Sequence, residues 1–321
     1  MRILLVKTSS LGDVIHNLPV VSDLARRHPG AIIDWVVEET FADIPRLHPA
    51  VRRIIPVAMR RWRRKLWSPT TWRQWREFRD QLQQEAYDLV LDSQGLIKSA
   101  VIARKARLAD GGRRCGFDTE SARERLAARF CDHRFHVAKN QHAVERNRQL
   151  AAAAAGTVTG LAPDYGIRAA PLAADWLPKG GYAVLLTATS RTEKEWPEPD
   201  WQALGMALIA TGLRCVLPAG SPDERKRAAR LVSSLGRAVA PPSMTLAELA
   251  SLLAGAALVV GVDTGLVHLA AALDRPTLAL YCGSDPSLTG VHGGSNCINL
   301  GGRGAPPTAH EAVDQALRML A

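Results

Sequence analysis

A short polar stretch near the start of the chain combines residue types that can do acid–base chemistry. Asp13 follows Ser9 and Ser10, directly after the apolar residues 3–6. A buried strand that ends in such a turn places its polar groups where open α/β sheets bind ligands, outside the carboxyl ends of the strands. Asp13 is therefore the first candidate for a general base. Because Ser and Asp also cap helices by satisfying free backbone N–H groups, spacing alone leaves a purely structural role open.

The second half of the chain has a turn suited to binding a diphosphate. Thr189 and Ser190 follow an apolar run and precede Lys194. Hydroxyls, backbone N–H groups and one cation are the groups that bind a diphosphate. The alternative is a loop with an exposed lysine, and the residue types alone do not separate the two.

A further strand–turn–helix pattern follows at residues 259–268. Asp263 is placed to bond a sugar hydroxyl, and Thr264 and Gly265 begin a helix whose N-terminus favours an anion. His268 lies on that helix, where a single histidine is usually structural. Glu224 follows another strand, where it can accept from ribose hydroxyls or complement the dipole of its own helix.

Positive charge is concentrated in the first half of the chain. Residues 1–160 carry 28 Lys and Arg against 17 Asp and Glu, whereas residues 161–321 carry 13 against 14. The densest run, residues 60–65, is followed by Trp67, Trp72 and Trp75, so cations and indoles alternate. This pattern fits an anionic membrane or lipid head group, a nucleic acid, or a solvated helix face.

These side chains require a framework of parallel strands. Apolar strands expected at residues 3–6, 32–37, 54–57, 89–92 and 113–116 alternate with helical patterns, as do those at 182–186, 215–218, 258–261 and 277–281. Helices are expected at 201–210, 223–235, 246–254 and 310–320. At 321 residues the chain is long enough for two domains. We expect an α/β protein with domains at 1–165 and 181–321 and a Pro-, Gly- and Ala-rich linker at 166–180.

Three ordered motifs carry a resemblance to a known family. They are Lys-Thr-Ser-Ser-Leu-Gly-Asp-Val-Ile-His at 7–16, Asp-Ser-Gln-Gly-Leu-Ile-Lys-Ser at 92–99 and Val-Asp-Thr-Gly-Leu-Val-His-Leu at 262–269. The chain resembles the lipopolysaccharide heptosyltransferases of glycosyltransferase family 9, the type I enzymes in particular, over nearly its whole length. The resemblance implies a GT-B fold, two Rossmann-like domains facing a central cleft, with the C-terminal helix packed back on the first domain. It also implies heptose transfer from ADP-L-glycero-β-D-manno-heptose.

The same resemblance implies a role for each candidate residue. Asp13 is the expected catalytic base, and Kdo-lipid A is the expected acceptor. The expected acceptor-binding residues are Ser10, Arg60, Arg61, Arg63, Arg64, Lys65 and Arg123, the last expected on a helix beside Glu124. The expected donor-binding residues are Thr189, Ser190, Lys194, Glu224, Asp263, Thr264, Gly265 and His268.

The implied reaction is a single displacement with inversion at the anomeric carbon. Asp13 takes a proton from a Kdo hydroxyl, whose oxygen attacks C1 of the heptose as ADP departs. The chain has no Asp-x-Asp sequence and no ligand-like His/Asp spacing, so we expect neither a metal nor a cofactor. Lys194 and the helix N-terminus at Thr264 are expected to neutralise the leaving diphosphate instead.

Three alternatives stay open on the sequence alone. A type II heptosyltransferase would keep the donor motifs, although residues 7–10 and 60–65 favour type I. A sugar-nucleotide epimerase would need no lipid acceptor, and a basic nucleic-acid or membrane-surface binding protein would leave the two turns of the neutral half without a purpose. The chain has no signal-peptide pattern and no apolar stretch long enough to span a bilayer. We therefore expect a cytoplasmic protein, and the family resemblance implies one that is peripheral on the inner membrane and does not bind nucleic acid.

Overall fold

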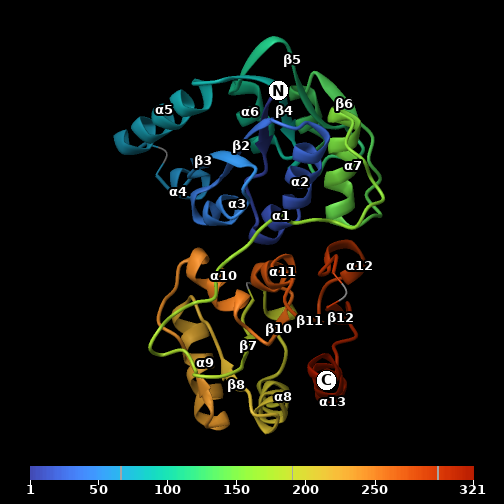
Figure 1. The fold of residues 1–321 in the computed structure, drawn as a ribbon. Coiled ribbons are helices and arrows are strands. Elements are labelled where there is room, and N and C mark those ends of the chain that lie inside the picture. Colours follow the sequence, from blue (N-terminus) through green and yellow to red (C-terminus); the bar gives the residue numbers. More distant parts are fainter. Residues whose placement is uncertain (66, 190, 295) are drawn as a thin grey trace. The chain divides into compact units, whose positions relative to one another are not determined.

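The chain forms two compact units. The computed structural model describes residues 1–65, 67–189, 191–294 and 296–321. Unit 1 comprises Met1–Ile167 and unit 2 comprises Arg168–Ala321 (Figure 1). Residues 156–181 contain no helix or strand. The two units are therefore connected by irregular chain.

Unit 1 is built on a six-stranded parallel sheet. Its strands are β1 (Arg2–Val6), β2 (Ile32–Glu38), β3 (Val51–Val57), β4 (Ala86–Asp92), β5 (Arg107–Phe117) and β6 (His133–Phe135). They lie in the order β3-β2-β1-β4-β5-β6, which is the Rossmann order. Four consecutive apolar residues of β1, from Ile3 to Val6, are fully buried, as expected of a strand covered on both faces.

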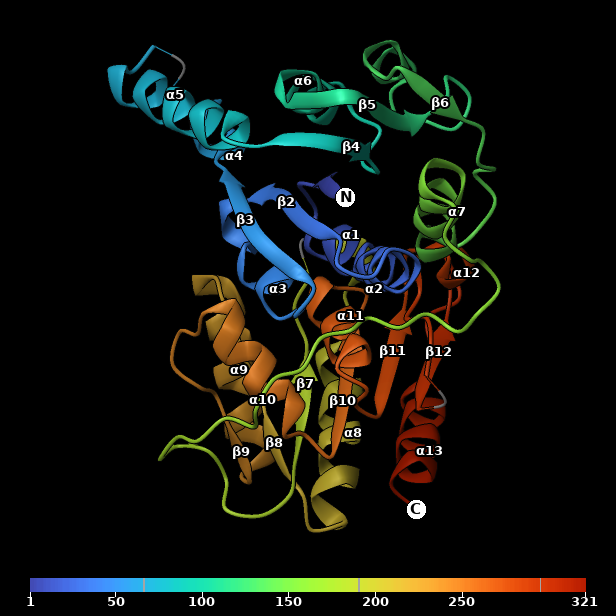
Figure 2. The ribbon, with the colours of Figure 1, turned by 45° about the horizontal axis from the view of Figure 1, so that its top comes forward.

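Helices follow the strands of unit 1. They are α1 (Leu11–Ile15), α2 (Leu18–Arg27), α3 (Asp43–Arg46), α4 (Met59–Trp62), α5 (Pro69–Gln83), α6 (Ile97–Lys105) and α7 (Ala143–Ala155), with the 3₁₀ turns η1 (Glu39–Phe41) and η2 (Arg125–Phe130). Helix α5 starts at Pro69, whose fixed backbone angle suits the first helical position. The N-terminal end of α5 points away from the sheet of unit 1 (Figures 1 and 2).

Unit 2 repeats the same architecture. Its strands are β7 (Tyr182–Leu186), β8 (Arg214–Val216), β9 (Ala238–Val239), β10 (Leu258–Val262), β11 (Thr277–Tyr281) and β12 (Cys297–Gly301). They lie parallel in the order β12-β11-β10-β7-β8-β9. Numbered from the first strand of its own unit, this order is identical to that of unit 1.

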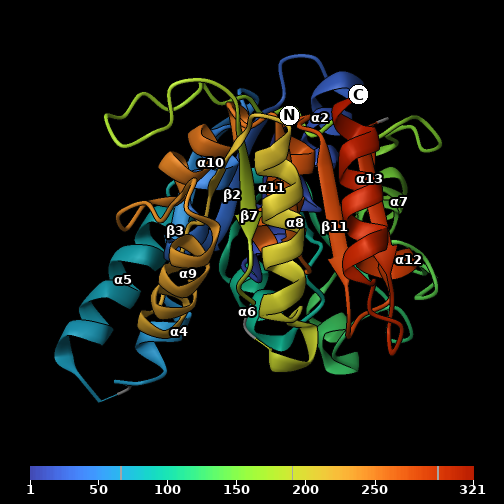
Figure 3. The ribbon, with the colours of Figure 1, turned by 90° about the horizontal axis from the view of Figure 1, so that it is seen from below.

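The helices of unit 2 cover its sheet. They are α8 (Glu198–Ala210), α9 (Pro222–Leu235), α10 (Leu246–Ala254), α11 (Gly265–Ala272), α12 (Pro286–Thr289) and α13 (Ala309–Leu320), with the turn η3 (Thr192–Lys194). Helices α8 and α13 lie side by side (Figure 3). Ala312 and Ala316 of α13 belong to the buried core of unit 2. The C-terminal helix is therefore an integral part of this unit.

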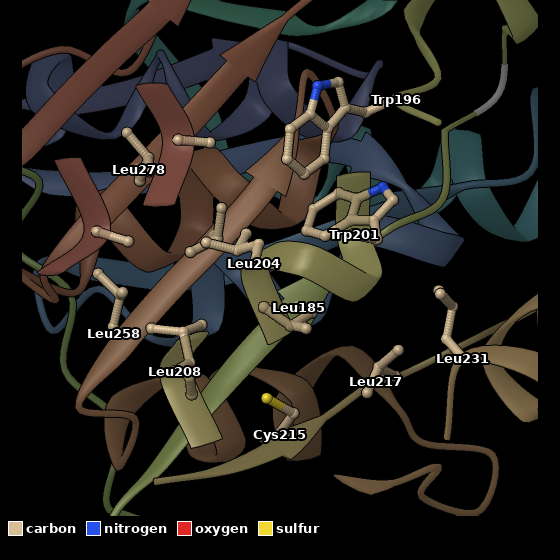
Figure 4. Close-up of a cluster of buried hydrophobic side chains, with 14 of the residues drawn as sticks. Leu185, Trp196, Trp201, Leu204, Leu208, Cys215, Leu217, Leu231, Leu258 and Leu278 are labelled. Carbon is tan, nitrogen blue, oxygen red and sulfur yellow. The ribbon is translucent and has the colours of Figure 1, made fainter. Parts of the chain in front are cut away.

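The core of unit 2 contains two fully buried tryptophans between the sheet and α8. The rings of Trp196 and Trp201 meet edge to face, with centroids 5.0 Å apart (Figure 4). Such aromatic pairs contribute about 1 kcal/mol beyond the area that they bury. Trp196 Nε1 also donates to the carbonyl of Pro307 at 2.8 Å. This bond ties the segment before α8 to the segment before α13.

The expected α/β class with two Rossmann-like parallel sheets is confirmed. All nine expected strands are present, and those at Tyr182–Leu186 and Thr277–Tyr281 have the expected bounds. Three short strands, β6, β9 and β12, were not expected from the sequence. β6 has three residues and β9 only two, while β12 is partly exposed, so none of them carries a strong apolar signal.

Strand order reverses at the centre of each sheet, between β1 and β4 in unit 1 and between β7 and β10 in unit 2. Open α/β sheets bind ligands at this switch point, outside the carboxyl ends of the strands. In unit 1 the chain leaves these strands at Val6 and Asp92, and in unit 2 at Leu186 and Val262. The three motifs noted in the sequence and the Thr189–Lys194 turn all begin at these strand ends.

Candidate functional site

Asp13 lies in the first turn of α1, directly beyond the end of β1, with a side chain that is 16% exposed. Its Oδ2 accepts from the backbone N–H of Ser10 at 2.9 Å and from the Ser10 hydroxyl at 3.1 Å. Its Oδ1 lies 3.3 Å from Nη2 of Arg123. Asp13 therefore caps its helix, as the structural interpretation predicts, and its carboxylate also lies at the switch point, where the proposed base has to be.

Arg123 lies in the loop between β5 and η2, so the expectation that it lies on a helix is wrong. The backbone N–H of Glu124 donates to the carbonyl of Gly95 at 3.0 Å, which ties this loop to the end of β4. Gly95 has φ +65°, and a Cβ there would lie 3.3 Å from the backbone nitrogen of Arg123. Glycine thus permits the close approach that brings Arg123 to Asp13.

The amide of Gln94 joins the loops that follow β1 and β4. Its Oε1 accepts from the backbone N–H groups of Thr8 at 2.9 Å and Ser9 at 3.1 Å, and its Nε2 donates to the carbonyl of Ser9 at 2.6 Å. The Ser9 hydroxyl also accepts from Nζ of Lys98 at 2.9 Å. These bonds fix the turn that precedes Asp13.

A pocket in unit 1 opens beside Asp13. It is lined by Lys7, Asp13, Ser93, Gln94, Phe117, Ser121, Arg123, Ala143, Arg146 and Asn147. Lys7 is buried, and its Nζ donates to the carbonyl of Ser93 at 2.8 Å and to Oδ1 of Asn147 at 3.3 Å. The Arg146 guanidinium donates to two backbone carbonyls and lies 5.0 Å from the ring centroid of Phe117. Three cations and one carboxylate therefore face this pocket.

The charges in this pocket shift one another's protonation. Burial lowers the pKa of Lys7 to about 8, although the nearby carboxylate of Asp13 acts in the opposite direction. Burial by itself would raise the pKa of Asp13, but the charges of Lys7 and Arg123 and the bonds from Ser10 outweigh it and lower that pKa. At neutral pH Asp13 is thus an ionised carboxylate that can accept a proton.

Lys7, Gln94, Arg146 and Asn147 were not among the residues expected at the site. Lys7 and Gln94 belong to motifs already recognised, and Lys7 follows an uninterrupted apolar run, which is an unusual place for a lysine. The position of Lys7 could have indicated a polar site at the end of the strand, because a buried lysine needs polar partners. Arg146 and Asn147 lie on α7, far along the chain, and no local pattern distinguishes them from other helical polar residues.

We call residues 60–65 the basic segment. Its first residue is fixed at the end of β2, where Oε1 of Glu38 accepts from the backbone N–H of Arg60 at 3.0 Å. Arg61 makes a two-point ion pair with Glu39, with distances of 3.0 and 2.9 Å. The side chains of Arg60, Arg61, Arg63, Arg64 and Lys65 are all exposed. The basic segment with its five cations is therefore anchored at the end of β2, the strand that neighbours β1 in the sheet.

The tryptophans near the basic segment do not form one uniform surface. The Trp62 side chain is 6% exposed and packs on Phe78 of α5 with ring centroids 5.9 Å apart. The expectation that cations and indoles simply alternate on a binding face is therefore wrong for Trp62, which is a core residue. Trp67 and Trp72, in contrast, are 92% and 53% exposed.

In unit 2 an ion pair joins the loops that follow β7 and β10. Lys194 Nζ lies 2.5 Å from Oδ2 of Asp263, and the same oxygen accepts from the Ser284 hydroxyl at 2.6 Å. The Thr189 hydroxyl donates to the backbone carbonyl of Asp263 at 3.3 Å. The expected donor residues Thr189, Lys194 and Asp263 therefore come together, and Ser284, from the loop after β11, is a member that the sequence did not indicate.

His268 is buried on α11, and its Nε2 lies 3.6 Å from Oδ1 of Asp263. Burial would raise the pKa of Asp263, but hydrogen bonds from His268, Lys194 and Ser284 outweigh it and lower that pKa far below its usual range. The carboxylate therefore stays ionised and holds the lysine and the histidine in place.

Of the other expected donor residues, Thr264 and Gly265 follow β10, whereas Glu224 follows β8. Thr264 is the N-cap of α11 and Gly265 its first residue, so the backbone N–H groups of this helix start beside Asp263. Glu224 caps α9: its Oε2 accepts from the backbone N–H groups of Gly220 at 2.7 Å and Ser221 at 3.2 Å. Ser190 lies outside the described residues.

Among residues 1–65, 67–189, 191–294 and 296–321, no group of three or more His, Cys, Asp or Glu side chains is arranged to hold a metal ion. Metal independence stays a prediction.

Across those described ranges, every helix is too short or too polar to span a bilayer.

Comparisons with known proteins agree with this geometry. The family model described as Glycosyltransferase family 9 (heptosyltransferase) matches residues 75–315. Lipopolysaccharide heptosyltransferase 1 of Pseudomonas aeruginosa is 49% identical over 305 residues, which cover 94% of this chain and 84% of that protein. The protein of the same name from Escherichia coli K12 is 46% identical over 299 residues, 93% of each chain.

Solved structures give the same relationship. Escherichia coli heptosyltransferase WaaC with ADP has a TM-score of 0.91 and 44% identity, and the match covers 100% of both chains. Escherichia coli ADP-heptose heptosyltransferase II shares the fold at a TM-score of 0.75 and 21% identity, over 100% of this chain and 98% of that one. The expected GT-B architecture is confirmed. With a family model matched over more than half of its length, this chain is a glycosyltransferase and belongs to glycosyltransferase family 9, the heptosyltransferases.

Proposed function

We propose that this enzyme transfers L-glycero-D-manno-heptose from ADP-heptose to a Kdo residue of Kdo-lipid A, in assembly of the lipopolysaccharide inner core. Relatives named heptosyltransferase 1 match more than nine-tenths of the chain at 46–49% identity. A relative named heptosyltransferase 2 matches only 102 residues, at 33% identity. A structure of WaaC contains ADP-2-deoxy-2-fluoro heptose, at a TM-score of 0.87. These relationships favour the type I reaction over the type II alternative.

The observation that carries the mechanism is the placement of the Asp13 carboxylate. This carboxylate is ionised, held on one side by Ser10 and on the other by Arg123, at the switch point of unit 1. A general base must be ionised and fixed before it can accept a proton from the acceptor hydroxyl. In the proposed reaction this proton moves to Asp13, the acceptor oxygen attacks C1 of the heptose, and the configuration there is inverted.

Acceptor binding falls to the cations of unit 1. The Kdo carboxylates and lipid A phosphates are anions, and guanidinium groups can bind such groups with two parallel hydrogen bonds. Arg60, Arg63, Arg64 and Lys65 are exposed, and the charge of Arg60 partly offsets the rise in the pKa of Glu38 that burial causes. Arg61 is paired with Glu39, so an acceptor anion has to compete with that carboxylate for its guanidinium.

Donor binding falls to unit 2. Lys194 and the N-terminus of α11 at Thr264 and Gly265 place positive charge and N–H donors at one strand end. In the proposed reaction they bind the diphosphate and stabilise the charge that develops as ADP leaves. Glu224 is proposed to accept from the ribose hydroxyls, and its second role is the cap that the structure shows.

ADP release tests the proposal. The wild-type enzyme is mixed with ADP-heptose, with and without Kdo-lipid A, and the Asp13→Ala variant is run beside it. Release that requires both substrates and Asp13 is the expected result. Release without acceptor would instead indicate a hydrolase or an epimerase-like activity, and equal rates for Asp13→Ala would exclude this residue as the base.

A further inference from the structure

Two tryptophans of unit 1 are exposed in a way that the reaction does not explain. Trp67 is 92% exposed and Trp72 is 53% exposed, whereas Trp62, in the same stretch of chain, is packed against Phe78. An exposed indole does not contribute the hydrophobic stabilisation that the buried indole of Trp62 contributes. The chain therefore presents Trp67 and Trp72 outward although it has a core nearby that accepts an indole.

Helix α5 has an apolar face and, over its first half, a basic one, and the exposed acidic residues Glu77 and Asp80 lie further along the helix. Phe78 and Leu82 are buried and turn one face toward the core of unit 1. Trp72, Arg73 and Arg76 are exposed and share the opposite face, since residues three and four apart are neighbours on a helix. The end of α5 that carries them points away from the sheet (Figures 1 and 2).

The charge around these indoles is uniform. Residues 59–76 contain seven Arg and Lys and no Asp or Glu. The next residue, Glu77, is acidic, and its Oε1 lies 3.8 Å from Nε of Arg73. Exposed indoles beside exposed cations suit the interface of an anionic bilayer, where Trp sits at the level of the head groups and Arg is attracted by surface charge.

We propose that Trp67, Trp72, Arg73 and Arg76, the docking surface, bind the enzyme to an anionic lipid bilayer. This inference rests on the proposed function, because the proposed acceptor is anchored in such a bilayer. The docking surface is continuous along the chain with the basic segment, which starts at Arg60 beside the end of β2. Docking through α5 would thus hold the acceptor-binding cations at the membrane surface.

Vesicle co-sedimentation tests the docking surface directly. The full-length enzyme is mixed with vesicles of phosphatidylethanolamine and phosphatidylglycerol, without any acceptor. Arg73→Gln/Arg76→Gln should weaken partitioning about 25-fold, since each basic residue near an anionic surface contributes roughly fivefold. Trp67→Ala/Trp72→Ala should also weaken it, and the decrease should persist at high salt because it is not electrostatic. Met206→Ala, which removes a 63% exposed side chain of unit 2, is the matched apolar control.

Two controls separate docking from simple charge and from misfolding. Arg125→Gln/Arg129→Gln removes two exposed cations of unit 1 outside the docking surface and should leave partitioning unchanged. Thermal unfolding should show that all variants are folded, as expected because the substituted side chains are exposed. Equal partitioning of the docking-surface variants and the wild type would overturn the proposal.

Activity on two forms of the acceptor separates docking from catalysis. The docking-surface variants should retain the wild-type rate on a water-soluble, deacylated acceptor and lose rate only on acceptor embedded in vesicles. Loss of rate on both forms would place these residues in the acceptor site and overturn the proposal. Binding of single-stranded RNA as tight as that of vesicles, lost in the same variants, would also overturn it. Vesicle binding that depends on these residues, without transfer to either acceptor, would support docking while contradicting the proposed function.

Discussion

The two units have the same strand order, but different interactions connect the loops at their switch points. In unit 1 the neutral amide of Gln94 links the loops after β1 and β4. In unit 2 the ion pair between Lys194 and Asp263 links the loops after β7 and β10. Residues 1–160 have a net charge of +11 and residues 161–321 a net charge of −1. Two sheets with the same strand order therefore carry different sites, and the difference lies in a few loop residues.

This difference bears on what each site can do. In unit 1 the acid of the site, Asp13, faces a pocket and is surrounded by cations that keep it ionised. In unit 2 the acid, Asp263, is bonded to Lys194, Ser284 and His268, so its charge acts mainly on its neighbours. We therefore propose that unit 1 supplies a proton acceptor, whereas unit 2 supplies a positioned cation.

The sharpest way to break this comparison is to remove the carboxylate of unit 1. Asp13→Ala should lower kcat about a hundred- to ten-thousandfold, the usual contribution of a general base. Binding of ADP by unit 2 should be unchanged. Both quantities follow from ADP-release kinetics and calorimetric titration with ADP. Asp13→Asn is the matched variant, because it keeps the shape and the capping oxygen but does not accept the proton.

The corresponding test in unit 2 removes its cation. Lys194→Ala should lower kcat roughly a hundred- to a thousandfold, as loss of one group that stabilises developing negative charge does. Asp263 would still be bonded to Ser284 and His268, so unit 2 should remain folded. Lys226→Ala, which removes an exposed lysine of α9, is the control and should match the wild type. A Lys194→Ala enzyme with a normal kcat would remove this residue from the leaving-group site.

A smaller effect should follow from the buried lysine of unit 1. Lys7 lowers the pKa of Asp13, so Lys7→Met should raise that pKa, and the base should then be protonated at a higher pH. The acid limb of the kcat/KM pH profile should therefore move to higher pH, with little change on the plateau. Lys7→Arg keeps the charge and should restore the limb. An unshifted limb in Lys7→Met, in a folded enzyme, would contradict this electrostatic role.

The smallest effects on stability and on substrate binding are expected at Glu224, which caps α9 and is also the proposed ribose contact. Glu224→Ala removes the cap of α9 and should lower the free energy of unfolding by about 1 kcal/mol. Glu224→Gln keeps an acceptor oxygen and should retain most of that stability. If the carboxylate also binds ribose, Gln should raise the KM for ADP-heptose about fivefold, because a charge-assisted bond is roughly twice as strong as a neutral one. Chemical denaturation and initial rates measure the two effects separately.

The sequence was sufficient for the fold because the central strands are apolar and regularly spaced. The turns after β1, β7 and β10 were also identified, since polar residues directly after an apolar run are a local signal. The pairing of Arg123 with Asp13 was not identifiable in the same way, because it depends on the approach of a loop to Gly95. Ser284 and Asn147 belong to the sites only through tertiary contacts, and a local pattern does not record those.

The distinction between tryptophans also required the structure. Trp62 and Trp67 lie five residues apart in one basic stretch, and composition treats them alike. Only the packing of α4 against α5 shows that one indole belongs to the core and the other faces solvent. The sequence therefore predicts one kind of surface for tryptophans that the structure places in two different environments.

The amide of Gln94 has a consequence for the energetics of the reaction. Because its oxygen accepts from Thr8 and Ser9 and its nitrogen donates to Ser9, both ends of the amide are occupied without any ligand. The turn leading to Asp13 is thus preorganised, and little reorganisation energy has to be spent on aligning the base after the acceptor arrives. A one-atom change at position 94, Gln to Glu, would turn a donor into a repelling charge beside the Ser9 carbonyl and disturb the turn that leads to Asp13.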